Sequence, residues 1–371
     1  MTQIQVLASI LILLVFTPSR SQWLRTAGPA GETILTLAAG GFDVYAGTYG
    51  GGVYRTNDSG STWSAINSGL GNDTVLTLAV KGTNLFAGTY SGGAFRSADN
   101  GSNWSTINNG LKSARVTAFG MDGINLYSGT NDSGAFRSVD EGSNWTSINN
   151  GLSQISVSSF AASGANLFLG SYGNNGGVYR STDSGNSWAS VNNGLGSTTI
   201  LCLAVSGPYL FAGTRDTGVF RSSNNGGSWI PADSGLTSPY VLSLVSSGGA
   251  LFAATVGGGI FVSLDTGASW NQANAGFTNS TATSLVIKGA SLFTGTANDR
   301  VWSRPLSEIN PVAIRMFHGI GQGYSGARDF SLIRSDFGVM FSRRGRYSPA
   351  TALYLATGKR ATKLMRPQSR K

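Results

Sequence analysis

Thr56-Asn57-Asp58-Ser59-Gly60-Ser61-Thr62-Trp63 is the first of six copies of one eight-residue motif, Ser/Thr-x-Asp-x-Gly-x-x-Trp, in this chain of 371 residues. The copies recur at a nearly constant interval, because their tryptophans stand 41, 41, 43, 41 and 41 residues apart at Trp63, Trp104, Trp145, Trp188, Trp229 and Trp270. A fixed period of about 40 residues is typical of repeat proteins, in which each unit buries its apolar face only against its neighbours.

The segments between the motifs are strand-like. Each unit opens with an apolar run, continues with a Leu-Phe-Ala-Gly-Thr type segment and a Gly-Val-Tyr-Arg type segment, and ends on a fourth segment that begins at the tryptophan. The 53 glycines against 9 prolines favour many tight turns. Four strands in each unit predict an all-β fold, a β-propeller of four-stranded antiparallel blades. The apolar runs are at 34–39, 75–80, 116–121, 157–162, 200–205, 241–246 and 282–287.

These seven runs predict seven blades, although the motif occurs six times. The seventh unit has three strands, with Trp302 in the third, and lacks the segment that begins at the motif tryptophan. The segment 22–28 has the features of this missing fourth strand, since its Trp23 lies 40 residues before Trp63. We therefore expect this N-terminal strand to complete blade seven and close the ring, which removes exposed sheet edges.

The motif itself is expected to form a turn. Asp or Asn bonds to nearby backbone N–H groups, Gly supplies a positive φ, and Trp buries a large ring. Calcium binding by these carboxylates is the alternative, but one copy has Asn224 in place of the acid, and most sites offer a single carboxylate. The structural residues predicted in this way are Asp58, Gly60, Trp63, Asp99, Gly101, Trp104, Asp140, Gly142, Trp145, Asp183, Gly185, Trp188, Asn224, Gly226, Trp229, Asp265, Gly267 and Trp270.

With six motifs in register over residues 22–308, the chain resembles the Asp-box (BNR) repeat proteins, which include bacterial sialidases, sortilin-type receptors, xyloglucan-degrading enzymes and the photosystem II assembly factor. The resemblance implies a seven-bladed propeller in which the motifs are structural and lie on the face opposite the ligand site. It does not imply one function, because a fold shared by many proteins hosts unrelated sites.

The candidate ligand-binding residues lie in the loops that share that opposite face, namely those joining strands two and three and those joining one blade to the next. A ring of tyrosines, amides and charges there is suited to a sugar or a peptide, while the alternative is that these polar groups only solvate a surface. Lys112 and Arg115 occur in one such loop. The predicted binding residues are Glu32, Tyr49, Asp73, Tyr90, Asn131, Asp132, Tyr172, Arg215, Asp216 and Asp299.

Catalysis is less favoured than binding. The chain has no Arg-Ile-Pro segment of the kind that the resemblance to sialidases would imply. Arg55, Arg96, Arg137, Arg180 and Arg221 recur at one position of each blade, which indicates structural roles. The single cysteine, Cys202, lies in an apolar strand and is expected to be core, and no metal or cofactor is predicted. A glycosidase using Asp73, Asp132, Asp216 or Asp299 remains an alternative.

The two ends differ from the repeats. Residues 1–21 combine an apolar stretch with small residues before Gln22, which predicts a secretory signal, although no Lys or Arg precedes the stretch. The segment 305–371 holds 12 of the 26 Lys and Arg and 3 of the 17 acids. We predict that residues 309–371 form a basic tail that is either disordered or translated from a displaced reading frame.

The sequence therefore predicts an exported, monomeric propeller at residues 22–308 that acts as a binding scaffold, with a glycan or protein ligand at the channel mouth opposite the motifs. No transmembrane segment is expected, and no nucleic acid is expected on the propeller. The alternatives are a sialidase-like or xyloglucanase-like glycoside hydrolase and an assembly factor resembling the photosystem II helper.

Overall fold

Strand pairing divides the chain into seven four-stranded sheets, seen in a computed structural model that describes residues 22–153, 155–173, 175–309, 330–335 and 338–343. In chain order the first three blades are β2 (Ile34–Gly40), β3 (Asp43–Thr48), β4 (Val53–Thr56) and β5 (Ser64–Ala65); β6 (Val75–Lys81), β7 (Asn84–Thr89), β8 (Ala94–Ser97) and β9 (Ser105–Thr106); and β10 (Val116–Met121), β11 (Leu126–Thr130), β12 (Ala135–Ser138) and β13 (Thr146–Ser147).

The next three blades repeat this pattern. They are β14 (Val157–Ser163), β15 (Asn166–Ser171), β16 (Gly177–Ser181) and β17 (Ala189–Ser190); β18 (Ile200–Ser206), β19 (Tyr209–Thr214), β20 (Val219–Ser222) and β21 (Ile230–Pro231); and β22 (Val241–Ser247), β23 (Ala250–Thr255), β24 (Gly259–Ser263) and β25 (Asn271–Gln272). Blade seven is β26 (Ala282–Lys288), β27 (Ser291–Thr296), β28 (Trp302–Pro305) and β1 (Leu24–Arg25).

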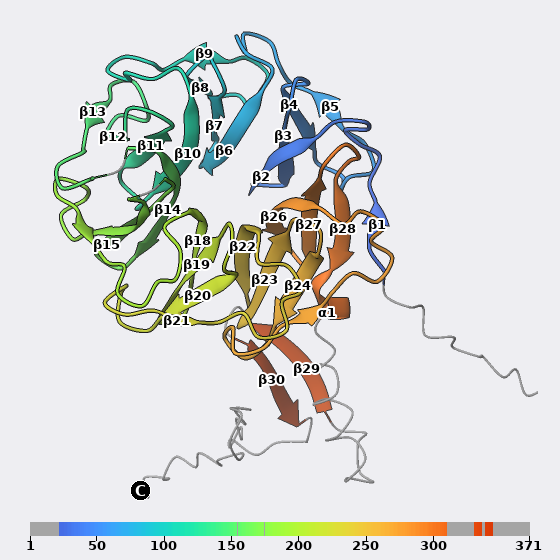
Figure 1. Cartoon of the computed structure of the whole chain (residues 1–371). Coiled ribbons are helices and arrows are strands. Elements are labelled where there is room, and N and C mark those ends of the chain that lie inside the picture. Colours follow the sequence, from blue (N-terminus) through green and yellow to red (C-terminus); the bar gives the residue numbers. More distant parts are fainter. Residues whose placement is uncertain (1–21, 154, 174, 310–329, 336–337, 344–371) are drawn as a thin grey trace, which may run out of the picture. The chain divides into compact units, whose positions relative to one another are not determined.

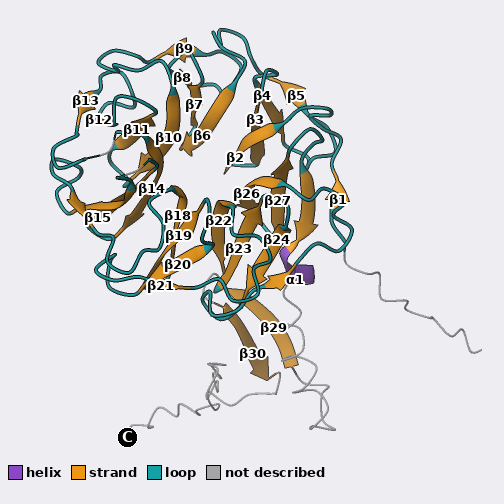
Figure 2. Ribbon diagram, viewed as in Figure 1, coloured by secondary structure: helices purple, strands orange, loops and turns teal. Residues whose placement is uncertain are grey.

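The blades stand around a central channel, with the first strand of each blade innermost (Figure 1). All pairings are antiparallel, so the predicted all-β, seven-bladed propeller of four-stranded antiparallel blades is confirmed. Within the described residues the one helix is the short α1 (Leu306–Ile309), and the rest is strand and loop (Figure 2). No helix in that part of the chain is long and apolar enough to cross a membrane.

The ring closes as expected, because β1 pairs with β28 through Leu24 opposite Ser303 and Arg25 opposite Trp302. Trp23 is 2% exposed, and its indole Nε1 donates a hydrogen bond of 2.6 Å to the carbonyl of Ala273 in the preceding blade. The segment that begins the described chain is thus packed into the last blade.

The core lies between neighbouring blades. One cluster joins Phe86 of blade two with Val116, Phe136 and Trp145 of blade three. The motif tryptophans also bond across blades, since each of five indoles donates to a carbonyl just after the fourth strand of the preceding blade: Trp104 to Ile66, Trp145 to Ile107, Trp188 to Ile148, Trp229 to Val191 and Trp270 to Ala232. Each blade therefore needs the next one, as a repeat architecture requires.

The eight-residue motif forms the same turn in each copy. In blade four, Ser181 Oγ donates to Asp183 Oδ1 and accepts from the N–H of Gly185, while the N–H and Oγ–H of Ser187 donate to the two carboxylate oxygens of Asp183. The residue after the acid has positive φ, as at Ser184 (φ 57), and the motif glycine has positive φ as well. These bonds lower the pKa of Asp183 to about 2, with the Ser187 side chain contributing most.

A recurring arginine supports this turn from the blade before it. The Nη1 of Arg96, Arg137, Arg180 and Arg221 donates to the carbonyl of the positive-φ residue of the following motif, namely Glu141, Ser184, Asn225 and Thr266. The fifth arginine, Arg55, differs and pairs with Asp43 at 3.0 Å within its own blade. The structural role predicted for these arginines is what the contacts show.

Two compact units divide the chain, Met1–Asn310 and Pro311–Lys371. In the second unit the structure describes one hairpin, β29 (Phe330–Ser335) with β30 (Gly338–Arg343), in an antiparallel pairing. The predicted signal segment and most of the predicted tail lie outside the described residues, so those predictions stay predictions.

Candidate ligand-binding face

The alternating direction of the strands separates two faces of the propeller. We call the face with the loops between strands two and three and between successive blades the loop face, and the face with the eight-residue motifs the motif face. The described propeller ends on the motif face, because β28 runs toward it and the N–H of Leu306 bonds to the carbonyl of Ala290 in a hairpin tip on that side.

Two positions in each blade form the inner rim of the loop face. One residue precedes the inner strand and the other follows the second strand, and the backbone N–H of the second bonds to the carbonyl of the first, as in Tyr90 to Thr74 at 3.0 Å and Tyr172 to Ser156 at 3.1 Å. We call these residues the rim. They are Thr33, Thr74, Arg115, Ser156, Thr199, Tyr240 and Thr281 at the first position and Tyr49, Tyr90, Asn131, Tyr172, Arg215, Val256 and Ala297 at the second.

Five rim residues from blades two, three and four are linked side by side, and we call them the rim cluster: Tyr90, Arg115, Asn131, Ser156 and Tyr172. The guanidinium carbon of Arg115 lies 4.6 Å from the centre of the Tyr90 ring. The hydroxyl of Tyr172 donates to Asn131 Oδ1, and the hydroxyl of Ser156 donates to the Asn131 carbonyl.

Electrostatics tie a further predicted residue to this cluster. Burial raises the pKa of Tyr172, Asp132 raises it further, and Arg115 and the Ser156 hydroxyl oppose the shift. Asp132 is exposed and accepts a hydrogen bond from its neighbour Ser133. The rim cluster and Asp132 together therefore offer a cation, a carboxylate, an amide and two phenol rings in one region of the rim.

A second arginine–tyrosine contact lies farther round the rim. The Arg215 guanidinium of blade five is 6.0 Å from the centre of the Tyr240 ring of blade six. Asp216, the next residue, is exposed. Tyr49 is the most open of the predicted aromatic residues, with 66% of its surface exposed, and Tyr90 is 49% exposed.

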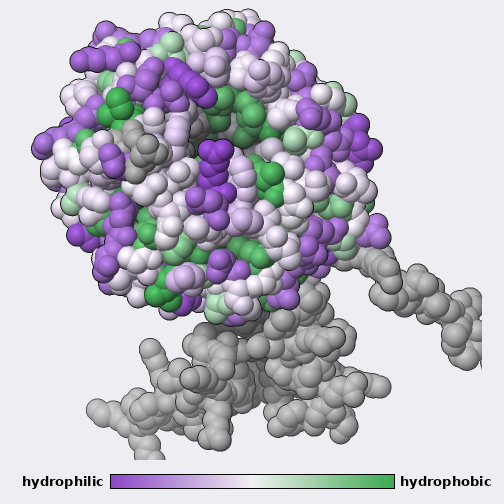
Figure 3. Space-filling model, viewed as in Figure 1, coloured by the Kyte–Doolittle hydropathy of each residue, from purple (hydrophilic) through white to green (hydrophobic). Residues whose placement is uncertain are grey.

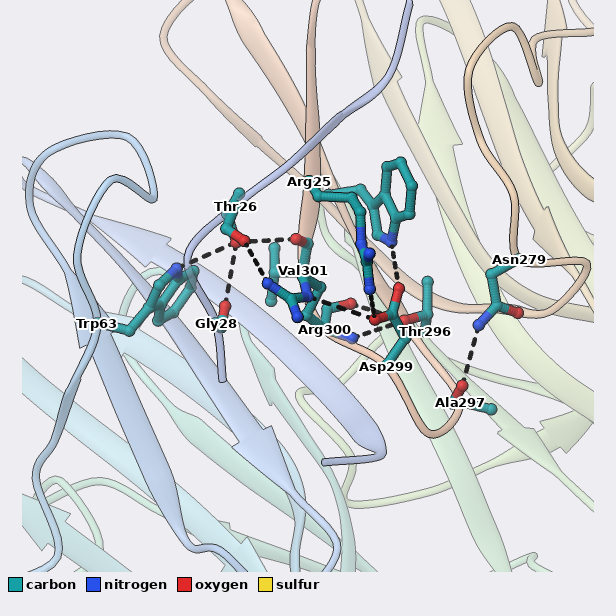
Figure 4. A network of polar contacts seen from close by, with 11 residues as sticks. Arg25, Thr26, Gly28, Trp63, Asn279, Thr296, Ala297, Asp299, Arg300 and Val301 are labelled. Atoms are coloured by element: carbon teal, nitrogen blue, oxygen red, sulfur yellow. Dashed lines mark hydrogen bonds and ion pairs between the residues drawn. The ribbon is translucent and has the colours of Figure 1, made fainter. Parts of the chain in front are cut away.

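The other predicted residues are engaged differently. Asp299 accepts bonds from Arg25, from Arg300 Nε at 3.3 Å and from Trp302 Nε1 at 3.0 Å, which together fasten β1 into blade seven (Figure 4). Burial acts to raise the pKa of Asp299, but the Arg25 and Trp302 hydrogen bonds outweigh it, and the pKa is lowered. Asp299 is thus the centre of the ring closure.

Glu32 and Asp73 support turns of the loop face. The Glu32 side chain lies against Gly51, where an added Cβ would come within 2.9 Å of its carboxyl group. The Asp73 carbonyl accepts the N–H groups of Gly50 at 3.1 Å and Gly52 at 2.8 Å. Glu32 and Asp73 belong to blades one and two, and they take no part in the contacts of the rim cluster.

The channel contains an open cavity of about 290 Å³ lined by inner-strand residues. The wall is mixed, with Leu35, Leu76 and Leu201 beside Thr117 and other hydroxyl residues. Within the described residues, no group of three or more His, Cys, Asp or Glu side chains is arranged to hold a metal ion. His318, the one histidine of the chain, lies outside them.

Sequence reasoning missed Tyr240 and did not single out Arg115. A signal existed in the repeat itself, since the first rim position is Thr or Ser in every blade except at these two residues. What the sequence could not show is that both exceptions stack on a side chain of an adjacent blade.

Comparison with known proteins identifies the fold of this chain but not its family. No protein-family profile matches the sequence, and no curated protein matches it either. Among solved structures, YCF48 from Cyanidioschyzon merolae is similar at a TM-score of 0.60 with 14% identity, over 77% of this chain and 99% of that one. A structure of YCF48 bound to D1 peptide has a TM-score of 0.63, 15% identity and coverage of 77% and 97%.

A glycoside hydrolase is similar to the same degree. The GH74 enzyme of Niastella koreensis has a TM-score of 0.61 and 16% identity, over 92% of this chain and 60% of that one, so this chain spans about three fifths of the enzyme. At such identities the likeness shows a β-propeller fold that binding proteins, glycoside hydrolases and assembly factors share, and it shows no specific function.

Proposed function

We propose that this protein is an Asp-box propeller that acts as an exported binding scaffold and holds a glycan or protein ligand on the loop face. The rim cluster carries the proposal. It gathers two tyrosines, an arginine and an amide from three blades, and such convergent polar and aromatic groups are typical of ligand sites. The motif face, by contrast, repeats one turn.

Two further features support a binding role for this face. The repeated residues of the propeller bond within or between blades, whereas the loop face is where the blades differ from one another. In solved structures of similar fold, one YCF48 is bound to a peptide, which is in keeping with a ligand on a propeller.

Catalysis as a glycosidase has less support. A glycosidase acid needs a raised pKa so that it is protonated near neutral pH. Where the structure describes an acid with a shifted pKa, the shift is downward, at Asp58, Asp99, Asp122, Asp140, Asp183, Asp265 and Asp299. Chromogenic glycosides provide the test, and hydrolysis that is lost in Asp132→Asn or Asp216→Asn would replace the binding proposal with an enzymatic one.

The binding proposal itself is tested with a glycan array and a protein pull-down, each run on the wild type and two variants. Tyr172→Phe removes the hydroxyl that bonds Asn131, and Tyr90→Ala removes the ring under Arg115, so both are expected to weaken retention about tenfold. Ile124→Ser is the matched control, because Ile124 is 76% exposed in a hairpin of the motif face. Equal loss in the control, or no ligand in either assay, contradicts the proposal.

A further inference from the structure

In the propeller residues that the structure describes, the cations without a carboxylate or carbonyl partner all lie on the loop face. In the described propeller, each other lysine and arginine bonds to a carboxylate or a backbone carbonyl: Arg25, Arg55, Lys81, Arg96, Arg137, Arg180, Arg221, Lys288, Arg300 and Arg304. No such bond is present within the described residues for Lys112, Arg115 and Arg215. All three belong to loops of the same face.

Arg115 keeps two donor groups for a ligand. Its guanidinium packs on the face of the Tyr90 ring and its Nε is buried, so the two Nη groups, which have no hydrogen bond among the described residues, are the donors that a ligand can reach. Stacking uses the flat side of the guanidinium, whereas the N–H groups along the edge are the ones that bind a carboxylate through two parallel bonds. Arg215 has the same kind of aromatic support from Tyr240.

Acidic groups beside these cations limit the kinds of ligand that the face can bind. Asp132 and Asp216 are exposed on the same face, and Asp132 is close enough to Tyr172 to raise its pKa. A sugar acid suits this mixture of charges, because its hydroxyls can donate to the aspartates while its carboxylate meets the guanidinium.

The apolar content of the face argues against a peptide. Apart from the two open tyrosines, the exposed large apolar residue near the rim cluster is Ile155, whose carbonyl accepts the N–H of Gly134. The face seen in Figure 3 is largely hydrophilic away from its centre, and hydrophobic residues border the central hollow. Peptide sites usually bury apolar anchors in a pocket, and exposed tyrosine rings beside hydroxyl acceptors suit a sugar instead.

We propose that the ligand is a glycan that carries carboxylate groups, an inference that rests on the proposed function. One carboxylate is bound by Arg115, and the neighbouring sugars lie along Tyr90 and Tyr172. Arg215 and Tyr240 provide a second subsite of the same kind farther along the rim.

Titration calorimetry of the full chain tests this with three acidic probes, namely hexamers of galacturonate, guluronate and hyaluronate, and with the methyl ester of any that binds. We expect at least one acid to bind about tenfold or more tightly than its ester. Arg115→Gln should weaken binding of that acid about tenfold, while Lys112→Gln, a loop neighbour without an aromatic partner, should change it less than about threefold. Unchanged thermal midpoints confirm that both variants fold.

Several results overturn the inference and leave the proposed function standing. These are an ester that binds as tightly as its acid, a poly-glutamate peptide that binds as tightly as the glycan, or no acid bound while the array or the pull-down finds another ligand that depends on Tyr172. Equal weakening by Arg115→Gln and Lys112→Gln, abolished by salt, also overturns it, because it would indicate diffuse charge attraction.

Discussion

Single residues decide the motif turn, and blade five provides the natural test of which atoms matter. There Asn224 Oδ1 accepts the N–H of Ser228 at 2.9 Å, and its Nδ2 donates to the Ser228 hydroxyl at 3.0 Å. Asp183 of blade four has the same serine partners at Ser181 and Ser187. Asn can therefore replace Asp by reversing one hydrogen bond.

We predict that Asp183→Asn keeps the thermal midpoint close to that of the wild type, whereas Asp183→Ala lowers it by several degrees, because three bonds of the turn are lost. Calorimetry at pH 7 measures both variants. A destabilisation of the Asn variant as large as that of the Ala variant would mean that the negative charge, as needed for a bound cation, is what matters.

Acid sensitivity is expected to follow from the same carboxylate. Its pKa is about 2 in the folded protein and 3.8 ordinarily, so its contribution is fully present above about pH 4 and is lost as the pH falls toward 2. The wild type should therefore lose more stability than Asp183→Asn between pH 5 and pH 2, by a small margin because the group is open to solvent. Parallel pH curves of the two proteins would contradict this.

At the scale of elements, contacts between blades hold the array together, and the Arg137 contact isolates one of them. Its Nη1 lies 2.9 Å from the Ser184 carbonyl. Arg137→Met keeps the length of the side chain and removes the donor, so we expect a loss of about 1 kcal/mol in the free energy of unfolding. Urea denaturation measures it, with Lys112→Met as the surface control, and equal effects of the two changes would show that the contact is unimportant.

β1 is the element on which closure depends, and Trp23, the residue before it, is buried. Its ring packs against Phe277, 5.8 Å away between centroids, and Trp302 lies in the same cluster. Trp23→Ala should cost about 3–5 kcal/mol, as for other buried aromatic residues. Trp23→Phe should cost about 1 kcal/mol, because Arg304 Nη1 also donates to the Ala273 carbonyl and keeps it satisfied. Urea unfolding separates the two, and similar losses would contradict this account.

The sequence was sufficient for the elements but not for their side-chain partners. The period and the orphan Trp23 predict seven blades and the exchange that completes the last one, because strand patterns and turn residues are local properties. Each inner strand has a shift in its pairing register, as between Val75 and Thr77, and the alternation of apolar and polar residues in the sequence does not predict it. Asp299 was expected at a ligand site, and its bonds to Arg25 and Trp302 arise only when the chain ends meet.

At the scale of the whole molecule, the two faces of the propeller have different roles. The motif face carries repeated turns, and the loop face carries the residues that break the repeat, Arg115 and Tyr240 among them. The arrangement requires a ring that stays closed, since the rim cluster draws its side chains from three blades and would separate if the blades did.

The buried thiol of Cys202 reports on that ring as a whole. Cys202 lies in β18 of blade five and packs against Val241 and Leu244 of blade six, and burial raises its pKa to about 12. Although Cys202 borders the channel cavity, its thiol faces the Val241 carbonyl of blade six at 3.8 Å, so a thiol reagent meets a reactive thiolate when the blades open. If the ring opens as one cooperative unit, Trp23→Ala in blade seven should accelerate labelling of Cys202 by about 100-fold for each loss of about 3 kcal/mol.

Asp183→Asn serves as the control and should leave the rate unchanged. Labelling that stays slow in a measurably destabilised Trp23→Ala protein would mean that blade seven opens by itself, and that closure protects its own edge without holding the distant rim.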